Sequence, residues 1–350
     1  MPGRARDPEA ARAAMRALIG DVLELIDEAE TRETSESRTE GTDVDRIKLG
    51  LVGIGKIARD QHLPAIAASV DFELAATASR HARVDGVEGH GSIAELIAAR
   101  PEIDALSLCT PPEGRFEQAM AAIAAGKHVM LEKPPAATVS EARTLERAAH
   151  AAGVSLYATW HSREAGEVDA ARDWLAARRI DVVRIRWMED IRQWHPGQDW
   201  ILAAGGFGVF DPGINALSIA TRILPQPLTV LAATMDIPAN RACPIAASVR
   251  FRTGSAEVDA KFDFLQTGEQ TWQIEVETDA GLLRLTEGGG RLERPGQPSL
   301  SGPDREYPRL YRAFAELIRS GQSDVDLQPI QLVADAFLVA ERRIVDPFQF

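Results

Sequence analysis

The sequence contains few cysteines, no long apolar run and no excess of positive charge. Its 350 residues include only two cysteines, Cys109 and Cys243. Because these two lie far apart in the chain, they predict neither a disulfide framework nor a zinc cluster. No apolar run is long enough to cross a membrane, and the net charge of −13 argues against nucleic acid or an anionic membrane as a partner. The sequence therefore predicts a cytoplasmic protein without a metal site.

The length and composition predict two globular domains and an N-terminal extension. A chain of 350 residues exceeds the usual size of one hydrophobic core. Residues 1–46 differ from the rest, because apolar side chains recur at helical spacing from Met15 to Ile26 and an acidic, polar stretch follows. We expect a helix and a flexible linker here. Acidic residues interrupt the apolar stretch, so we do not expect a secretory signal.

Short apolar strands alternate with helical segments from residue 47 to about residue 162. This alternation is typical of an α/β fold with a parallel, doubly wound Rossmann sheet. We expect strands at 47–52, 72–79, 103–109, 128–131 and 154–159, and helices from 57 and at 92–99, 116–125 and 139–152.

Residues 163–350 predict a second domain of the α+β class. Strands follow one another here with gaps of turn length, which is typical of an open, mainly antiparallel sheet. We expect strands at 180–189, 228–237, 244–252, 256–264, 270–278 and 282–286, with a hairpin turn at 279–281. Helices are expected at 214–224, 310–319 and 331–343.

A glycine motif follows the first strand of the Rossmann segment. Gly53 suits a tight turn, Gly55 lets the backbone approach a pyrophosphate, and Ala58 is small enough for close helix–strand packing. The amides that open the next helix would face the phosphates. We therefore expect a dinucleotide at this loop, in contact with Gly53, Ile54, Gly55, Lys56 and Ile57.

The end of the second strand bears on which dinucleotide binds. A carboxylate at this position binds the ribose 2′-hydroxyl of NAD, whereas an arginine nearby accommodates the 2′-phosphate of NADP. The sequence here is Ser79-Arg80-His81, without an acid. A serine hydroxyl and a guanidinium suit a phosphate, so we expect NADP to be preferred and NAD to remain possible.

Two further segments resemble the glucose–fructose oxidoreductase/inositol dehydrogenase family (Gfo/Idh/MocA). They are Cys109-Thr110-Pro111-Pro112 and Glu132-Lys133-Pro134, and the resemblance extends over residues 47–350. The segments at 55–62, 159–163, 194–198 and 208–216 are similar to the family's aldose dehydrogenases, which act on L-arabinose and D-galactose. The resemblance implies that Cys109, Thr110, Pro111, Pro112, Glu132 and Lys133 contact the cofactor.

The resemblance also implies the residues of the active site. Lys133 and Asp211 would be the catalytic pair. Many family members have a histidine at the position of Asn215. An asparagine cannot relay a proton, so the resemblance implies that Asn215 touches the sugar instead. The other sugar contacts would be His161, Glu189, Trp194, His195 and Trp272. Two alternatives stay open: Asp211 also suits a helix N-cap, and the tryptophans also suit a core.

The implied reaction is the oxidation of an aldose at C1 to its lactone, with L-arabinose and D-galactose as substrates and D-fucose as a further candidate. The residues do not decide whether Lys133 or Asp211 is the base. A glycosidase or epimerase that retains its cofactor, and a non-catalytic sensor of NADP or sugar, are the alternatives. Family members associate through the open sheet, so the resemblance also implies a homo-oligomer.

Overall fold

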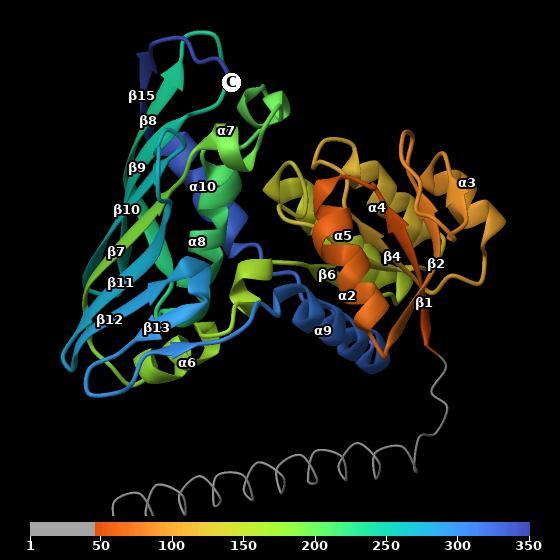
Figure 1. The fold of residues 1–350 in the computed structure, drawn as a ribbon, viewed down its shortest axis with the longest axis horizontal. Coiled ribbons are helices and arrows are strands. Elements are labelled where there is room, and N and C mark those ends of the chain that lie inside the picture. The colour runs from red at the N-terminus through yellow and green to blue at the C-terminus, as the bar shows by residue number, and fades with distance from the viewer. Residues whose placement is uncertain (1–45) are drawn as a thin grey trace, which may run out of the picture. The chain divides into compact units, whose positions relative to one another are not determined.

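The computed structural model describes residues 46–350 (Figure 1). The helix and linker expected before residue 46 lie outside the described residues. No helix within residues 46–350 has both the length and the apolar character needed to cross a membrane.

The first sheet has six parallel strands in the order β3-β2-β1-β4-β5-β6. This is the strand order of the Rossmann fold, in which ligands bind where the order reverses, between β1 and β4. The strands are short and buried on both faces, as apolar runs in a parallel sheet must be. They are β1 (Ile47–Val52), β2 (Phe72–Ala78), β3 (Gly89–His90), β4 (Ala105–Leu108), β5 (His128–Leu131) and β6 (Leu156–Ala158).

Helices cover both faces of this sheet. One face packs against α3 (Ile93–Ala99), α4 (Arg115–Ala124) and α5 (Val139–Ala152). The other packs against the π-helical turn η1 (Ala58–His62), α2 (Leu63–Ala68) and α9 (Glu306–Ser320). Because α9 comprises residues 306–320, the first sheet is completed by a segment that is distant in the sequence. The predicted domain boundary after residue 162 stays a prediction.

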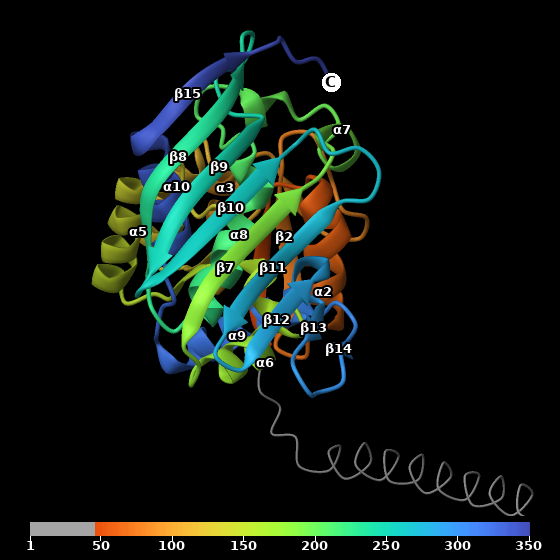
Figure 2. The same cartoon turned by 90° about the vertical axis from the view of Figure 1, so that its left-hand side faces the viewer.

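The second sheet has nine strands in the order β14-β13-β12-β11-β7-β10-β9-β8-β15 (Figure 2). All its pairings are antiparallel except β7 with β10 and β8 with β15. The strands are β7 (Ile180–Met188), β8 (Leu228–Pro238), β9 (Ala246–Thr253), β10 (Ala256–Asp263), β11 (Thr271–Thr278), β12 (Gly281–Thr286), β13 (Arg291–Glu293), β14 (Leu300–Ser301) and β15 (Ala340–Val345).

One face of the second sheet forms the largest core of the described chain. It packs against α6 (Val168–Leu175), α8 (Phe210–Ile223) and α10 (Gln328–Val339). Alternate residues of β9 and β10 are buried against these helices, and the residues between them are exposed. Among residues 46–350 no element covers the opposite face, which Figure 2 shows from the front.

The structure corrects several predicted helix boundaries and adds short elements; α9 begins at Glu306 and α10 at Gln328, four and three residues before their predicted starts. The helix expected at 331–343 ends at Val339, and residues 340–345 form β15 instead. Pairing with the edge strand β8 overrides the helical pattern there. Helix α8 begins at Phe210, four residues before the predicted start. The elements that the sequence did not predict are β3, α6, β13, β14, α7 (Ile191–Trp194) and the turns η2 (His161–Glu164), η3 (Asp199–Leu202) and η4 (Glu287–Gly289).

Candidate active site

The predicted dinucleotide loop lies at the carboxyl edge of the first sheet, at the reversal between β1 and β4. Gly53 has φ of +89°, and a Cβ on it would lie 2.8 Å from the amide nitrogen of Thr110. A side chain is therefore excluded there by backbone conformation and by the β4 loop. Around Gly55 a Cβ would meet nothing within 4 Å. A tight turn beside an open glycine backbone fits the pyrophosphate of a dinucleotide.

The segment Ser79-Arg80-His81 lies directly beside this loop. The Gly53 amide donates to the carbonyl of Ala78 at 2.9 Å, so the ends of β1 and β2 are held together. Arg80 and His81 are exposed, and Ser79 is half-buried. Arg83, which the sequence analysis did not identify, donates to the Ser79 carbonyl at 2.6 Å and so fixes this loop. The assignment of Ser79, Arg80 and His81 to the ribose site stays a prediction.

Arg115 connects the two other segments that were predicted to contact the cofactor, the loop after β4 and the loop after β5. Its guanidinium donates to the carbonyls of Thr110, Glu132 and Pro134. The side chain is 2% exposed, and burial lowers its pKa to about 10, which leaves it charged at neutral pH. It therefore clamps the loop after β4 to the loop after β5. The sequence offered no signal for this residue, because its partners are main-chain atoms.

Lys133 and Asp211 meet, as predicted. The Lys133 ammonium donates to the Asp211 backbone carbonyl at 2.9 Å and to Oδ1 of its carboxylate at 3.3 Å. Lys133 follows β5 of the first sheet, and Asp211 lies in the first turn of α8. The N-cap of α8 is Val209, so Asp211 does not cap this helix. The side chains of Lys133 and Asp211 are 16% and 7% exposed, so the pair is largely shielded from water.

A second polar chain continues from Asp211 toward the other sheet. His195 Nδ1 lies 3.9 Å from Asp211 Oδ2, and His195 Nε2 is hydrogen-bonded to Glu189 Oε1 at 2.9 Å. The other Glu189 oxygen accepts the indole N–H of Trp272 at 2.9 Å. The sequence predicted these residues separately as sugar contacts. The structure shows that Trp272, Glu189, His195 and Asp211 follow one another as a network.

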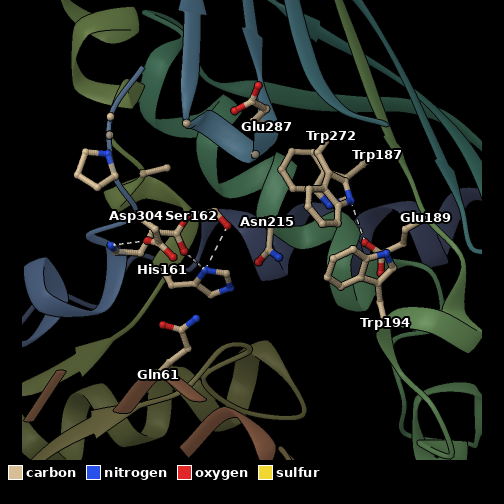
Figure 3. Close-up of a pocket in the computed structure, with 17 residues that line it drawn as sticks. Gln61, His161, Ser162, Trp187, Glu189, Trp194, Asn215, Trp272, Glu287 and Asp304 are labelled. Carbon is tan, nitrogen blue, oxygen red and sulfur yellow. Dashed lines mark hydrogen bonds and ion pairs between the residues drawn. The ribbon is translucent and has the colours of Figure 1, made fainter. Parts of the chain in front are cut away.

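A pocket of about 530 Å³ adjoins this network (Figure 3). Five predicted sugar contacts line it: His161, Glu189, Trp194, Asn215 and Trp272. His195, Lys133 and Asp211 are not among the lining residues, but His195 is hydrogen-bonded to Glu189, which is. In Figure 3 Asn215 lies between the tryptophans on one side and His161 on the other.

Three tryptophans form one wall of this pocket. Trp272 lies edge-on to Trp194, with ring centroids 5.0 Å apart, and is stacked near Trp187 at 6.3 Å. Trp194 is 37% exposed. Trp187, which the sequence analysis placed only in a strand, is therefore an additional wall residue. The alternation of β7 that puts it on the buried face would have been the signal.

His161 marks the opposite side of the pocket. Its Nδ1 is hydrogen-bonded to Glu306 of α9 at 2.6 Å. Burial opposes a charge on the ring, but the Glu306 carboxylate raises the pKa of His161 above its usual value. Other lining residues that sequence reasoning missed include Gln61, Ser162, Glu287, Asp304 and Glu306. They come from segments far apart in sequence, so no local motif indicated them.

Glu132 is held in a buried cluster behind Lys133. Its Oε2 accepts the backbone N–H of Lys133 at 2.8 Å, and its Oε1 accepts the Tyr307 hydroxyl at 2.6 Å and faces His62 at 3.2 Å. Burial alone would raise the pKa of Glu132, but these partners hold it well below the usual range. Glu132 thus orients the backbone at Lys133. His62 and Tyr307 were not predicted.

No cluster of three or more His, Cys, Asp or Glu side chains that could hold a metal occurs in the described part of the chain.

A family model, described as the oxidoreductase family with an NAD-binding Rossmann fold (Gfo/Idh/MocA), matches residues 47–159. A galactose 1-dehydrogenase from Pseudomonas fluorescens is 46% identical over 304 residues, which cover 86% of this chain and 98% of that protein. The chain therefore belongs to the Gfo/Idh/MocA oxidoreductase family.

Solved structures of the oxidoreductase family agree with this assignment. A crystal structure of a D-galactose-1-dehydrogenase protein from Rhizobium etli has a TM-score of 0.85 and 52% identity, and the match covers 89% of this chain and all of that one. A 3-ketoreductase from Actinomadura kijaniata, solved with NADP and TDP-benzene, has a TM-score of 0.73 at 22% identity, with 86% and 100% coverage. The latter shows the common fold. The chain is thus a sugar dehydrogenase homologue with an NAD-binding Rossmann fold.

Proposed function

We propose that this protein oxidises an aldose, D-galactose or L-arabinose, at C1 to the sugar lactone with NADP as the preferred electron acceptor. The observation that carries the proposal is the Lys133–Asp211 pair, shielded from water beside a pocket with three tryptophans. The likeness to galactose 1-dehydrogenases over nearly the whole described chain supports it. D-fucose, which has a methyl group at C5, fits the same reasoning.

In the proposed reaction, the cofactor accepts the hydride and residues of the chain take up the proton and position Lys133. The bound nicotinamide supplies the acceptor for the hydride that leaves C1. The Lys133–Asp211 pair takes up the proton of the anomeric hydroxyl as one coupled unit, because an ammonium hydrogen bond joins its members. The Asp211 carboxylate can accept the proton directly, whereas the Lys133 ammonium can accept it only after giving up one of its own. Glu132 and Arg115 hold the backbone on both sides of Lys133, so its amine is positioned before the sugar arrives.

The pocket explains why two sugars are proposed. D-galactose and L-arabinose share the configuration of the ring hydroxyls at C2, C3 and C4, and differ in the group at C5. Indole faces suit the apolar side of such a ring, and Asn215 and His161 offer polar groups. A small group in an apolar pocket changes binding by only about 1–3 kcal/mol, so both sugars should react. D-glucose differs at C4 and would leave a polar group of the pocket unpaired.

A substrate panel tests this function. Purified protein is mixed with D-galactose, L-arabinose, D-fucose, D-xylose or D-glucose, with NAD or NADP, and absorbance at the reduced nicotinamide band is followed. We expect the first three sugars to react and NADP to give the higher kcat/KM. Absence of reduction with every sugar contradicts the proposal. Reduction of a stoichiometric amount that is never released favours the cofactor-retaining alternative.

The NADP preference has a direct test in Arg80. Arg80→Ala removes an exposed guanidinium beside Ser79, so we expect Kd for NADP to rise about tenfold, with Kd for NAD nearly unchanged. Calorimetric titration measures both. Arg46→Ala, outside the predicted ribose site, serves as the control. Equal effects of Arg80→Ala on both cofactors would remove Arg80 from the selectivity.

We further propose that the protein is a homo-oligomer that pairs through the uncovered face of the second sheet. This face is broad, and its strands present exposed side chains of both charges, such as Arg250 and Arg252 on β9 and Glu257 and Lys261 on β10. A two-fold axis on such a face would bring unlike charges together.

A further inference from the structure

We propose that His195 acts through Asp211: it takes the reaction proton from the Asp211 carboxylate and passes it toward the surface. This inference rests on the proposed function, since oxidation of the anomeric carbon frees one proton per turnover. The O–H bond of the anomeric hydroxyl breaks, its electron pair forms the new C=O bond, and the hydride leaves C1. The freed proton is left on the Lys133–Asp211 pair, which is largely buried and must release it before the next cycle.

The hydrogen bonds of Glu189 decide the tautomer of His195. One carboxylate oxygen already accepts the Trp272 indole N–H, and the other lies 2.9 Å from His195 Nε2. A carboxylate accepts hydrogen bonds and does not donate them, so Nε2 must carry the hydrogen. In the neutral ring Nδ1 then carries only a lone pair. That lone pair faces Asp211.

The distance between His195 and Asp211 fits an arrangement that awaits a proton. Nδ1 and Oδ2 lie 3.9 Å apart, beyond hydrogen-bonding distance. Two acceptors that face each other repel, and this accounts for the gap. A proton on either atom converts the pair into a donor and an acceptor, which then attract. The space between them is therefore suited to a transferred proton.

The route from Asp211 leads outward. The His195 side chain is 18% exposed, whereas the Asp211 side chain is 7% exposed. The ring is held edge-on against Phe264, with ring centroids 5.6 Å apart, and it follows α7 near the surface. Glu189 and Asp211 are its ion-pair partners among the described residues, and Lys133 lies on the far side of Asp211. The proton can thus pass from Oδ2 to Nδ1 and from the ring to water.

A measurement on the cofactor-free protein tests the tautomer without any turnover. The full chain contains seven histidines, so nitrogen NMR of histidine-labelled protein can be assigned by comparison with His195→Gln. We expect the neutral His195 ring to carry its hydrogen on Nε2. A hydrogen on Nδ1 would overturn the proposal. Because this result needs no sugar, it separates failure of the proposal from failure of the proposed function.

Kinetics of His195→Gln test the proton transfer. A glutamine amide can donate to Glu189 but cannot carry a proton, so we expect kcat to fall about tenfold or more, with KM for the sugar within about threefold. Added imidazole should restore part of the lost kcat in His195→Gln. It should not raise kcat of the wild type or of Lys133→Met. His150→Gln, on exposed α5, is the matched control.

Three outcomes would contradict the proposal: a raised KM with unchanged kcat, which assigns His195 to sugar binding; an unchanged kcat; or a loss of kcat that imidazole does not restore. Glu189→Gln gives a second reading if His195→Gln folds poorly. It keeps an acceptor toward Nε2 but removes the negative charge, so we expect a smaller fall in kcat. A fall larger than that of His195→Gln would also contradict the proposed order of transfer.

Discussion

Lys133 is held by contacts that leave its amine little freedom. Its ammonium donates to two oxygens of Asp211, and its own backbone N–H is bound by the neighbouring Glu132. An ammonium buried beside a carboxylate loses the motion that a surface lysine retains, so less entropy is lost when the substrate binds. The chemistry proposed for this residue depends on that restriction.

Replacement of the Lys133 amine tests its role directly. Lys133→Met keeps the length and much of the volume of the side chain, and we expect kcat to fall by about 100-fold or more. Cofactor affinity, followed by titration of the bound nicotinamide fluorescence, should change little. Lys48→Met, at the exposed start of β1, should behave as wild type. Normal turnover of Lys133→Met would exclude Lys133 from the mechanism.

His161 and Glu306 make stability depend on pH. The folded-state pKa of His161 is raised, so the pair stabilises the fold fully below the unfolded value of about 6.5 and loses this effect as pH rises through the folded value. Glu306→Gln should therefore lower stability by about 1–2 kcal/mol at pH 5.5 and by less at pH 9. Thermal unfolding at both values measures the difference. An effect that grows with pH would contradict the assignment.

At the scale of elements, α9 connects the end of the chain to the first sheet and to the site. Its buried face carries Tyr307 and Tyr311, which contact Glu132 and His62 inside the second face of the Rossmann sheet. Its first turn supplies Glu306 to the pocket. One helix thus braces the backbone of Lys133 and contributes to the pocket.

Removal of one hydroxyl from α9 tests this bracing. Tyr307→Phe leaves a buried carboxylate short of a donor, so we expect stability to fall by about 1.5–3 kcal/mol and kcat to fall with it. Chemical denaturation followed by tryptophan fluorescence gives the free energy of unfolding. Tyr157→Phe is the matched control, because no described residue forms a hydrogen bond with its hydroxyl. Equal effects of the two changes would show that Glu132 does not need Tyr307.

At the scale of the whole molecule, the two sheets differ in what their faces do. Helices cover both faces of the first sheet, and its carboxyl edge is left for the cofactor. The second sheet has helices on one face among residues 46–350, and the other face is charged and exposed. This uncovered face is the surface through which we propose that the subunits pair.

A change of charge on that face tests the proposed oligomer. Arg250→Glu reverses one charge of the proposed interface and should shift the protein toward the monomer in light scattering at low concentration. Arg312→Glu, on the exposed side of α9, should leave the mass unchanged. A wild-type protein that is monomeric at all concentrations would contradict the proposal.

Much of the fold could be predicted because its signals are local. The strands of the Rossmann sheet and helix α5 follow from apolar runs and glycine stops, and the structure confirms the Rossmann sheet and the mainly antiparallel second sheet. The helix expected over 331–343 was wrong in its last part, because the strand at 340–345 depends on an edge of β8 that lies a hundred residues away. Strands of two or three residues, such as β3 and β14, are too short to show a period.

The sequence by itself determined the family and predicted the dinucleotide loop and the main site residues, because these depend on residue types at fixed spacing. Only the tertiary structure decided how those residues are joined. It showed that His195 lies between Glu189 and Asp211, and that Arg115, Tyr307 and Glu306 hold the surrounding residues in place. Such contacts join side chains to distant partners and to main-chain atoms, and they exist only once the sheets and α9 have packed.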